Sequence, residues 1–253
     1  MTVARKRRGP GCLIMLVVMV GLLIGAFFLA DFGLRAFAEK QAAGQIQDAL
    51  PASATGDVSV SIGGASVIAQ YFAGSFDRVD VTAPKLTVDG VPASVHVVAT
   101  DVQPRVGGSI GQVVATIDLT AEALNGIAHA AGTPAETELT LGTDAVTYTG
   151  TLDALGITID YLATATPSTT PDALLFTPTG AEVTTDLGSF DLSGVVATVL
   201  GQTPIRVCVA KYLPAEVAVR SADVTPERAR ITLDSSTLVL TKQSLATLGT
   251  CPG

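Results

Sequence analysis

The residue types that could carry chemistry are few, and their spacing predicts no catalytic centre. His96 lies in an alternating apolar stretch and His129 in a short helical one, positions at which imidazoles are mostly structural or solvated. The sequence contains no P-loop and no H-E-x-x-H helix. Asp77, Asp80 and Asp89 could cooperate, but no base, nucleophile or metal cage accompanies them. We therefore expect no catalytic residue and no enzyme.

Cysteine chemistry is the second candidate. Cys12 lies in an apolar N-terminal segment, whereas Cys208 and Cys251 lie in the body of the chain. An exported body permits a disulfide, and closing this loop would stabilise the fold by about 4 kcal/mol on the chain-entropy estimate. Two unrelated reduced thiols are the alternative. Since an exported body permits the bond, we predict a Cys208–Cys251 disulfide. Because no histidine lies near either thiol, we expect no metal, and we expect no cofactor.

The elements that position these residues begin with an apolar segment. Residues 11–30 form a 20-residue run without a charge, which as a helix spans about 30 Å, the thickness of bilayer hydrocarbon. The basic residues Arg5 to Arg8 precede it and favour a cytoplasmic N-terminus. We predict a basic cytoplasmic tail over 1–10, a transmembrane signal-anchor over 11–30 and an extracytoplasmic domain over 31–253, at the cell inner membrane.

Cleavage of this segment is the alternative to anchoring. Ala36-Phe37-Ala38 has the small-x-small form of a signal-peptide cleavage site. It lies well beyond the end of the apolar run, which is itself longer than a usual signal h-region. These features favour an uncleaved anchor.

The chain beyond the apolar run changes from helical to strand periodicity. Residues 31–50 predict an amphipathic helix with an apolar stripe that would lie along a sheet; its members are Phe32, Ala36, Ala42, Ile46 and Leu50. After Pro51 the period becomes two, with a turn at Asp89-Gly90 and a short helix after Thr120. The predicted strands of the first half lie around residues 58–62, 79–88, 95–102 and 113–119.

The second half shows the same alternation of strands and a helix. Strands are predicted near residues 138–141, 145–149, 157–163, 181–185, 216–224, 228–234 and 237–240, with a helix at 192–200. The Pro/Thr/Ser run from Thr164 to Pro171 predicts a linker. The pattern indicates one α+β domain of mostly antiparallel sheet. That sheet could wrap a helix or curl around a cavity.

The composition of the chain limits the classes of partner that it can bind. Hydrophobic residues make up 48% of the chain but aromatic residues only 5%, so the apolar content is mainly Val, Ala, Leu and Ile. From Glu39 onward, 22 acidic residues outnumber 10 basic ones. Nucleic-acid binding requires a basic surface that displaces counterions. We therefore expect no nucleic-acid partner.

Two stretches carry a resemblance to a known family. Residues 58–90 (VSVSIGGASVIAQYFAGSFDRVDVTAPKLTVDG) combine a Gly-containing strand end, an apolar segment and a strand of the form G-x-[FY]-[DR]-x-V-D-V. Residues 207–234 (VCVAKYLPAEVAVRSADVTPERARITLD) resemble a closing pair of strands. Together they resemble the LmeA-like phospholipid-binding family of actinobacterial envelopes. In that family the segment after the Gly pair is more aromatic than the one from Ala65 to Ile68 here.

The resemblance implies a fold and a function. The implied fold is a curved sheet packed around a helix, similar to tubular lipid-binding domains, behind one transmembrane helix. The implied function is binding of anionic phospholipid in support of lipoglycan (lipomannan and lipoarabinomannan) assembly, with a membrane glycosyltransferase as a candidate partner. A scaffold that stabilises a glycosyltransferase or cell-wall enzyme without touching lipid is the alternative.

Candidate lipid-contacting residues follow from the bulky apolar side chains and the few basic residues. Val67, Ile68, Tyr71, Phe72 and Phe76 form an apolar cluster, which could be a core plug under the sheet or a lip that contacts lipid. An anionic headgroup would need one of the basic residues of the body; these candidates are Arg78, Lys85, Arg206, Lys211 and Arg220. Ordinary solvated strand positions are the alternative for these charges.

Overall fold

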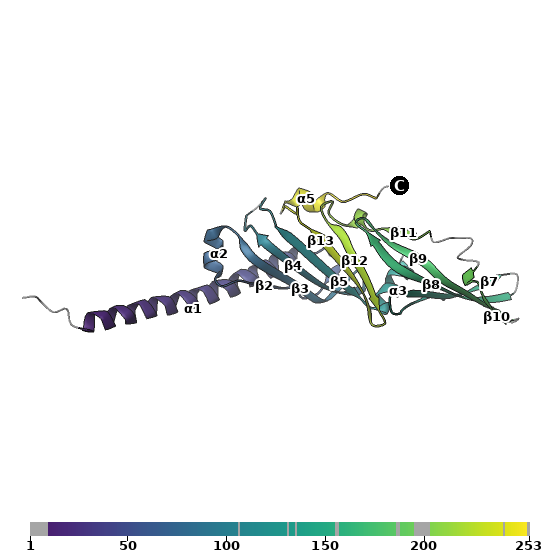
Figure 1. Ribbon diagram of the computed structural model, residues 1–253, viewed down its shortest axis with the longest axis horizontal. Helices are drawn as coiled ribbons and strands as arrows, with labels where there is room; N and C mark the ends of the chain where they lie inside the picture. Colours follow the sequence, from purple (N-terminus) through teal and green to yellow (C-terminus); the bar gives the residue numbers. More distant parts are fainter. Residues whose placement is uncertain are drawn as a thin grey trace, which may run out of the picture.

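The molecule is elongated. The computed structural model describes residues 10–105, 107–130, 132–134, 136–154, 157–185, 188–194, 203–239 and 241–251. A long helix projects from one end of a body built of two antiparallel sheets (Figure 1). The predicted α+β class with antiparallel sheets and an apolar N-terminal helix is confirmed. The basic residues Arg5 to Arg8 and most of the helix predicted over 192–200 lie outside the described residues.

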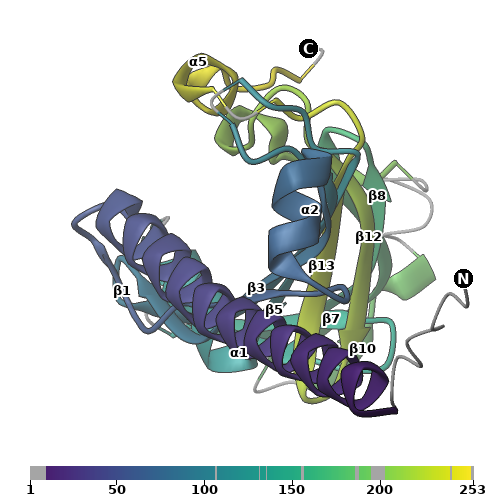
Figure 2. The ribbon, with the colours of Figure 1, turned by 90° about the vertical axis from the view of Figure 1, so that its left-hand side faces the viewer.

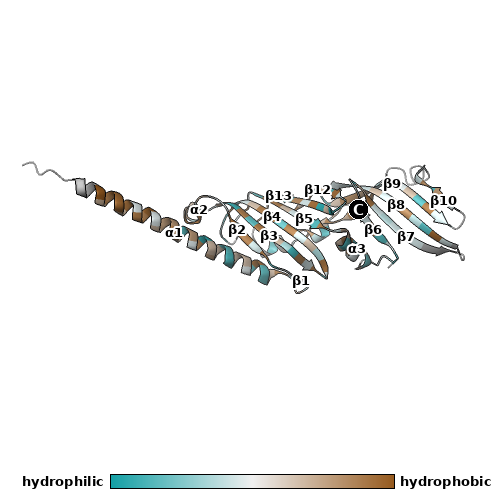
Figure 3. Ribbon diagram, turned by 90° about the horizontal axis from the view of Figure 1, so that it is seen from below, coloured by the Kyte–Doolittle hydropathy of each residue, from teal (hydrophilic) through white to brown (hydrophobic). Residues whose placement is uncertain are grey.

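Helix α1 (Pro10–Ala49) joins the predicted anchor and the predicted amphipathic helix into one 40-residue helix. Proline suits the first helical position, and the next proline, Pro51, follows the end of the helix. Its N-terminal half is apolar and stands clear of the sheets (Figure 3). Its most apolar 18-residue stretch has a mean hydropathy of 2.5, and α1 is the one helix in the described part of the chain that is long and apolar enough to cross a membrane.

The first sheet contains strands from both ends of the chain. Its members are β1 (Ala54–Thr55), β2 (Ser59–Ile62), β3 (Phe76–Val88), β4 (Val91–Val102), β5 (Gln112–Leu119), β12 (Ala218–Thr225) and β13 (Arg228–Ser235). Their order is β1-β3-β4-β5-β13-β12, with β2 also paired to β3, and every pairing is antiparallel. The predicted turn at Asp89-Gly90 joins β3 to β4, and both residues have positive φ, as such a tight hairpin requires.

The second sheet follows the first along the molecule. Its members are β6 (Glu138–Leu141), β7 (Val146–Ala154), β8 (Ile157–Thr170), β9 (Ala173–Thr185), β10 (Gly188–Asp191) and β11 (Ile205–Cys208). Hydrogen bonds from the Val219 amide to the Pro171 carbonyl (2.9 Å) and from the Asp144 amide to the Val224 carbonyl (3.0 Å) join it to β12 of the first sheet. Seen along the long axis, the strands form a curved wall (Figure 2).

Two element predictions are wrong. The predicted linker belongs mainly to β8, because its abundant Thr residues favour strands. Pro167 is tolerated there because, within the described strands, it is paired only with β9, so its missing N–H costs little. The strand predicted over 237–240 is reduced to a single bridge between Val239 and Ser109, and Leu240 lies outside the described residues.

The short helices cap and connect the sheets. They are α2 (Val67–Ala73), α3 (Ala121–Ala130), the 3-10 turn η1 (Ala210–Tyr212) and α5 (Lys242–Ala246). The predicted helix after Thr120 is α3, whose third amide, at Ala123, donates to the Thr120 hydroxyl (3.2 Å). Asn125 of α3 exchanges two hydrogen bonds with the backbone of Leu139, which fastens α3 to β6.

The core is thin. Among the described residues, no apolar side chain larger than alanine is less than 5% exposed. A filled sandwich would bury many such side chains completely. The sheets therefore leave much of their apolar surface incompletely covered.

Candidate functional site

Strand register gathers aliphatic side chains on one face of the first sheet. Val79, Val81 and Ala83 alternate along β3 with the polar Arg78, Asp80 and Thr82. Directly opposed residues of antiparallel strands share a face, so the aliphatic set continues across the sheet. Its members are Val60, Ile62, Val79, Val81, Ala83, Val95, Val97, Ala99, Val113, Ala115, Ile117, Leu119, Val219, Ala222, Val224, Ala229, Ile231 and Leu233. We call this surface the aliphatic face.

Most of the aliphatic face is half-buried. The central positions of β4 and β5, from Val95 to Ala99 and from Val113 to Ile117, retain exposure. Val60 and Ile62 beside α1 are buried, as are six positions elsewhere on the face: Ala83, Leu119, Val219, Val224, Ala229 and Leu233. The side chains are alanine methyl groups or branched aliphatic chains, and none has a polar atom. An apolar ligand laid on this face would therefore leave no side-chain donor or acceptor unpaired.

A cavity of about 510 Å³ lies between α1 and the α2 end of this sheet. Its lining comes from α1, β2, β3, β4 and the loop that follows β4: Ala42, Gln45, Val60, Ile62, Phe76, Val79, Val102, Gln103, Pro104 and Arg105. Its volume falls within the range of about 300–1,000 Å³ that is usual for small-ligand sites. The cavity is apolar inside and carries one cation, Arg105, in its lining.

Arg105 is available to an anion. Its guanidinium donates to the Gln103 side chain (2.7 Å). Within the described residues, Arg105 and Arg220 are the arginines without an ion pair, and only Arg105 lines the cavity. Arg105 was not among the predicted site residues, although it stands in the Pro/Gly-containing loop QPRVGG between two predicted strands. Binding residues often lie in loops at the ends of sheets, so the position of Arg105 in this loop could have indicated it from the sequence.

The predicted apolar cluster divides between core and surface. In α2, Val67 is buried (6% exposed) and Ile68 is half-buried, whereas Tyr71 and Phe72 are 61% and 84% exposed. Phe76 begins β3 and lines the cavity. The core-plug interpretation is therefore wrong for Tyr71 and Phe72 and holds for Val67. Lipid contact by this cluster stays a prediction.

The predicted headgroup cations Arg78 and Lys85 do not meet the apolar cluster at the cavity. Arg78 lies on the polar face and donates twice to Asp80 (both 2.7 Å), and this hydrogen bonding holds the pKa of Asp80 below its usual range. Lys85 lines a separate hollow of about 690 Å³. Its lining also includes three acidic residues, Asp118, Glu122 and Glu227, and the arginine Arg228, which is ion-paired with Asp118. Acidic neighbours make both sites unfavourable for an anionic headgroup.

Arg206, Lys211 and Arg220 also lie away from the cavity. Arg206 is ion-paired with Asp172, and the Lys211 amine lies 4.9 Å from the ring centre of Tyr212. Arg220 lies on β12, at the far edge of the first sheet from α1. The structure thus places none of the three at the cavity.

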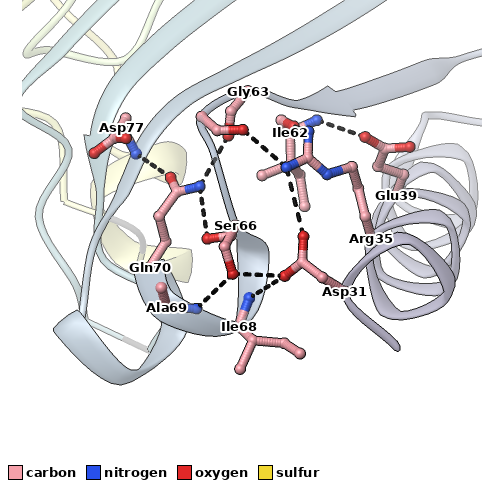
Figure 4. A network of polar contacts seen from close by, with 11 residues as sticks. Asp31, Arg35, Glu39, Ile62, Gly63, Ser66, Ile68, Ala69, Gln70 and Asp77 are labelled. Atoms are coloured by element: carbon pink, nitrogen blue, oxygen red, sulfur yellow. Dashed lines mark hydrogen bonds and ion pairs between the residues drawn. The ribbon is translucent and has the colours of Figure 1, made fainter. Parts of the chain in front are cut away.

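Three charged side chains, one helical turn apart on α1, fasten the helix to the body (Figure 4). Asp31, only 4% exposed, accepts hydrogen bonds from the Ser66 hydroxyl (2.7 Å) and the Ile68 amide (2.9 Å). Arg35 donates to the carbonyls of Ile62 (3.0 Å) and Gly64 (2.8 Å). Glu39 accepts from the Ile62 amide (2.8 Å). We call these contacts the anchor–body junction.

The junction corrects the predicted apolar stripe of residues 31–50. Phe32 was expected to lie against the sheet, yet it is 75% exposed. The polar side chains turn to the body here because the loop between β2 and α2 offers free backbone groups that need partners. Only farther along, at Ala42, does an apolar side chain of the predicted stripe line the cavity.

The two body cysteines are joined. Cys208 at the end of β11 and Cys251 form a disulfide with their Cα atoms 6.0 Å apart. Together with hydrogen bonds from Ala215 to Thr247 (2.8 Å) and from Gly249 to Leu213 (2.9 Å), it holds the C-terminal segment on the body.

One known protein family matches the part of the chain that forms this site. A model of the LmeA-like phospholipid-binding family matches residues 29–234. The match begins just before Asp31 and ends in β13, so it includes the anchor–body junction, the cavity and both sheets. No curated protein and no solved structure matches the chain.

Proposed function

This chain belongs to the LmeA-like phospholipid-binding family, and from that premise we propose that it is a membrane-anchored, extracytoplasmic protein that binds an anionic phospholipid. An acyl chain would lie in the cavity and along the aliphatic face, with the headgroup beside Arg105. The observation that carries this proposal is the half-exposed aliphatic face, which ends in an apolar cavity with one unpaired arginine.

The energetics of chain burial support this use of the face. Each methylene of an acyl chain gains about 0.8 kcal/mol on leaving water, provided that the surface it covers is apolar. Small aliphatic side chains form a smooth surface on which a flexible chain can lie. The low aromatic content of the sequence suits contact with acyl chains better than stacking on rings.

Retention of α1 as an anchor follows from the anchor–body junction. Cleavage after Ala38 would remove Asp31 and Arg35, and would leave the Ile68 amide and the Ile62 and Gly64 carbonyls without these partners. The hydrogen bonds to Ile62 and Ile68 are part-buried, and losing a partner from a group shielded from water lowers stability. The junction therefore supports an uncleaved helix, with the body held at the membrane on the extracytoplasmic side that the basic residues Arg5 to Arg8 favour.

The finer role comes from the family resemblance. We include in the proposal support of lipoglycan assembly at the outer side of the inner membrane, with a membrane glycosyltransferase as partner. A scaffold that touches no lipid would be expected to fill its core with the inward Val and Leu side chains. The half-exposed aliphatic face favours the lipid-binding interpretation over that alternative.

Native mass spectrometry of the full chain, purified in mild detergent, tests the site. Ala42→Phe places a ring in the cavity from the α1 side, and Ala49→Phe adds the same ring at an exposed position of the same helix. We expect the parent and Ala49→Phe to carry phospholipid and Ala42→Phe to lose most of it. A parent without lipid, or an Ala42→Phe variant with a full complement, would contradict the proposal.

The headgroup assignment is tested on the same preparations. Arg105→Gln removes the unpaired cation, whereas Arg78→Gln removes one that is already neutralised by Asp80. We expect the anionic share of the bound lipid to fall in Arg105→Gln and to stay unchanged in Arg78→Gln. Equal shares in both variants would contradict the assignment of Arg105 to the headgroup.

A further inference from the structure

Helix α2 turns its largest side chains away from the protein. Seven residues long, it buries Val67 and Gln70 against the body and exposes Tyr71 and Phe72, whose rings meet edge to face at 6.0 Å. No residue of α2 is charged. Single exposed apolar residues are common on protein surfaces, but two adjacent aromatic rings on an uncharged helix form a patch that suits an apolar partner.

The position of α2 along α1 identifies that partner. Asp31 is the first charged residue after the uncharged run 11–30, so in a helix that spans a bilayer it lies at the membrane boundary. Asp31 accepts hydrogen bonds from Ser66, the N-cap of α2, and from the Ile68 amide in its first turn. The start of α2 is therefore held at the level where α1 leaves the apolar run (Figure 4).

The orientation of α2 is also constrained. The Gln70 amide group donates to the carbonyls of Gly63 (3.0 Å) and Ser66 (3.1 Å), and its oxygen accepts from the Asp77 amide at the start of β3 (2.7 Å). Gly74 ends the helix in the left-handed conformation, with φ at 84°. Contacts at both ends leave α2 little freedom to turn Tyr71 and Phe72 inward.

From this arrangement we propose that α2 is a membrane-seated foot, whose Tyr71 and Phe72 rings lie in the headgroup region of the bilayer that α1 spans. On α1, Phe28 and Phe32, on either side of Asp31, are exposed apolar side chains as well. Aromatic side chains are enriched at this depth, because their rings are apolar enough to leave water while tolerating polar neighbours.

The foot explains how lipid would reach the cavity. Phe76, in the cavity lining, follows α2 after two residues and is paired with Val102, next to the loop that carries Arg105. The cavity thus lies at the end of the sheet that α2 would hold against the membrane. A lipid could then enter from the bilayer without crossing open water. This inference rests on the proposed anchoring of α1.

Tryptophan fluorescence tests the foot cleanly, because the chain contains no native tryptophan. The full chain is reconstituted into phosphatidylcholine–phosphatidylglycerol vesicles with bromine on the acyl chains, and acrylamide serves as the aqueous quencher. Phe27→Trp reports on the span, Phe72→Trp on the foot and Phe190→Trp on β10, at the opposite end of the molecule from α1 (Figure 1). Phe190 is the matched control because it too is an exposed aromatic residue.

We expect brominated lipid to quench Phe27→Trp and Phe72→Trp, and acrylamide alone to quench Phe190→Trp. If Phe27→Trp is quenched by lipid while Phe72→Trp behaves like Phe190→Trp, the foot is wrong and the anchor stands. If Phe27→Trp is not quenched by lipid, the anchoring fails and the foot with it.

A second comparison tests whether the junction sets the position of the foot. Asp31→Ala, introduced together with Phe72→Trp, removes the acceptor of the Ile68 amide. We expect the indole at position 72 to become more accessible to acrylamide, and the same change made with Phe27→Trp to leave the quenching of the span unaltered. Unchanged lipid quenching at position 72 would show that Asp31 does not position α2.

Discussion

Val67 and Phe72 lie five residues apart in sequence, yet they have opposite surroundings. Val67 is buried, as is Gln70, whereas Phe72 on the same short helix is largely exposed. Burial removes a side chain from water and makes its loss costly, while an exposed ring contributes little to folding. Substitutions at these two residues therefore compare a buried side chain of α2 with an exposed one.

Stability measurements should show this difference. Phe72→Ala is expected to change the free energy of unfolding by less than about 0.5 kcal/mol. Val67→Ala is expected to lower it by about 1–3 kcal/mol, because it leaves a small cavity under α2. Denaturant titrations of the full chain in one detergent give both values. A loss in Phe72→Ala as large as that in Val67→Ala would contradict its exposed placement.

Arg105 shows how a site residue is distinguished from other charges of the same type. Five arginines of the described chain are engaged by aspartates, and Arg105 is engaged by an uncharged glutamine. An ion-paired guanidinium has little remaining attraction for a headgroup, whereas an unpaired one keeps its charge available. In a body with a large acidic excess, this availability favours Arg105 as the headgroup contact.

At the scale of elements, strand pairing builds an ion pair on the polar face of the first sheet. Asp118 of β5 lies directly opposite Arg230 of β13 and accepts two hydrogen bonds from it (2.7 and 2.9 Å). The hydrogen bonds from Arg230, aided by the nearby charge of Arg228, hold the pKa of Asp118 below its ordinary value of 3.8. The folded state therefore binds a proton at this carboxyl less readily than the unfolded chain.

This lowered pKa predicts acid sensitivity. The contribution of Asp118 is complete above the unfolded pKa and is lost as pH falls through the lower folded pKa. We expect Asp118→Asn to lose on the order of 1 kcal/mol of stability at neutral pH and to lose less on acidification than the parent. Denaturation at pH values from 7 down to about 2 measures this difference, across the window in which a depressed aspartate titrates.

A control on the same sheet isolates the cross-strand pair. Asp89 stands in the exposed hairpin turn between β3 and β4, where the structure shows no ion pair to it. Asp89→Asn should keep the pH profile of the parent, since asparagine also tolerates the positive φ of that position. Identical acid profiles for the parent and Asp118→Asn would show that the pair with Arg230 does not contribute.

At the scale of the whole molecule, the disulfide closes the C-terminal part of the chain onto the second sheet. The bond restrains the segment from residue 208 to residue 251, which contains β12, β13 and α5. β12 and β13 belong to the first sheet, so the cross-link also restrains the strands that connect the two sheets. Loss of this link should therefore destabilise the whole body.

The predicted size of this effect is about 2–4 kcal/mol. The comparison is between Cys12→Ser and a variant that also carries Cys208→Ser and Cys251→Ser, both as the full chain in detergent. We expect Cys12→Ser, which keeps Cys208 and Cys251, to unfold at a higher denaturant concentration than the variant that lacks all three cysteines. Adding a reductant should remove this difference. Two thiols that alkylate freely in oxidised protein would refute the bond.

Several features were determined by the sequence alone. An uncharged run of 20 residues behind four basic ones predicts a membrane helix, because hydrocarbon thickness and the cost of burying charge depend only on local composition. Alternation with period two predicted most strands of the first sheet, the turn at Asp89-Gly90 and the helix after Thr120. The family resemblance was likewise carried by contiguous stretches, and the match over residues 29–234 confirms it.

Other features were decided only by the tertiary structure. Alternation shows that Val79 and Val81 share a face, but whether that face is covered depends on elements far away in the chain. The sequence could not show that Thr164 to Thr170 lies in β8 beside β9, because β propensity and linker composition overlap in Thr, Ser and Pro. It also could not assign Phe72 to the surface, because an apolar side chain has the same chemistry in a core as at a membrane.

The candidate site depends most strongly on long-range pairing. Ala42 of α1, Phe76 of β3 and Arg105 of the loop after β4 are far apart in sequence and meet only when β3 pairs with β4 and α1 docks on β2. Docking in turn requires hydrogen bonds from Asp31, Arg35 and Glu39 to backbone groups that no residue pattern reveals. Local periodicity can specify the strands and the helix, whereas the cavity between them exists only through contacts between distant segments.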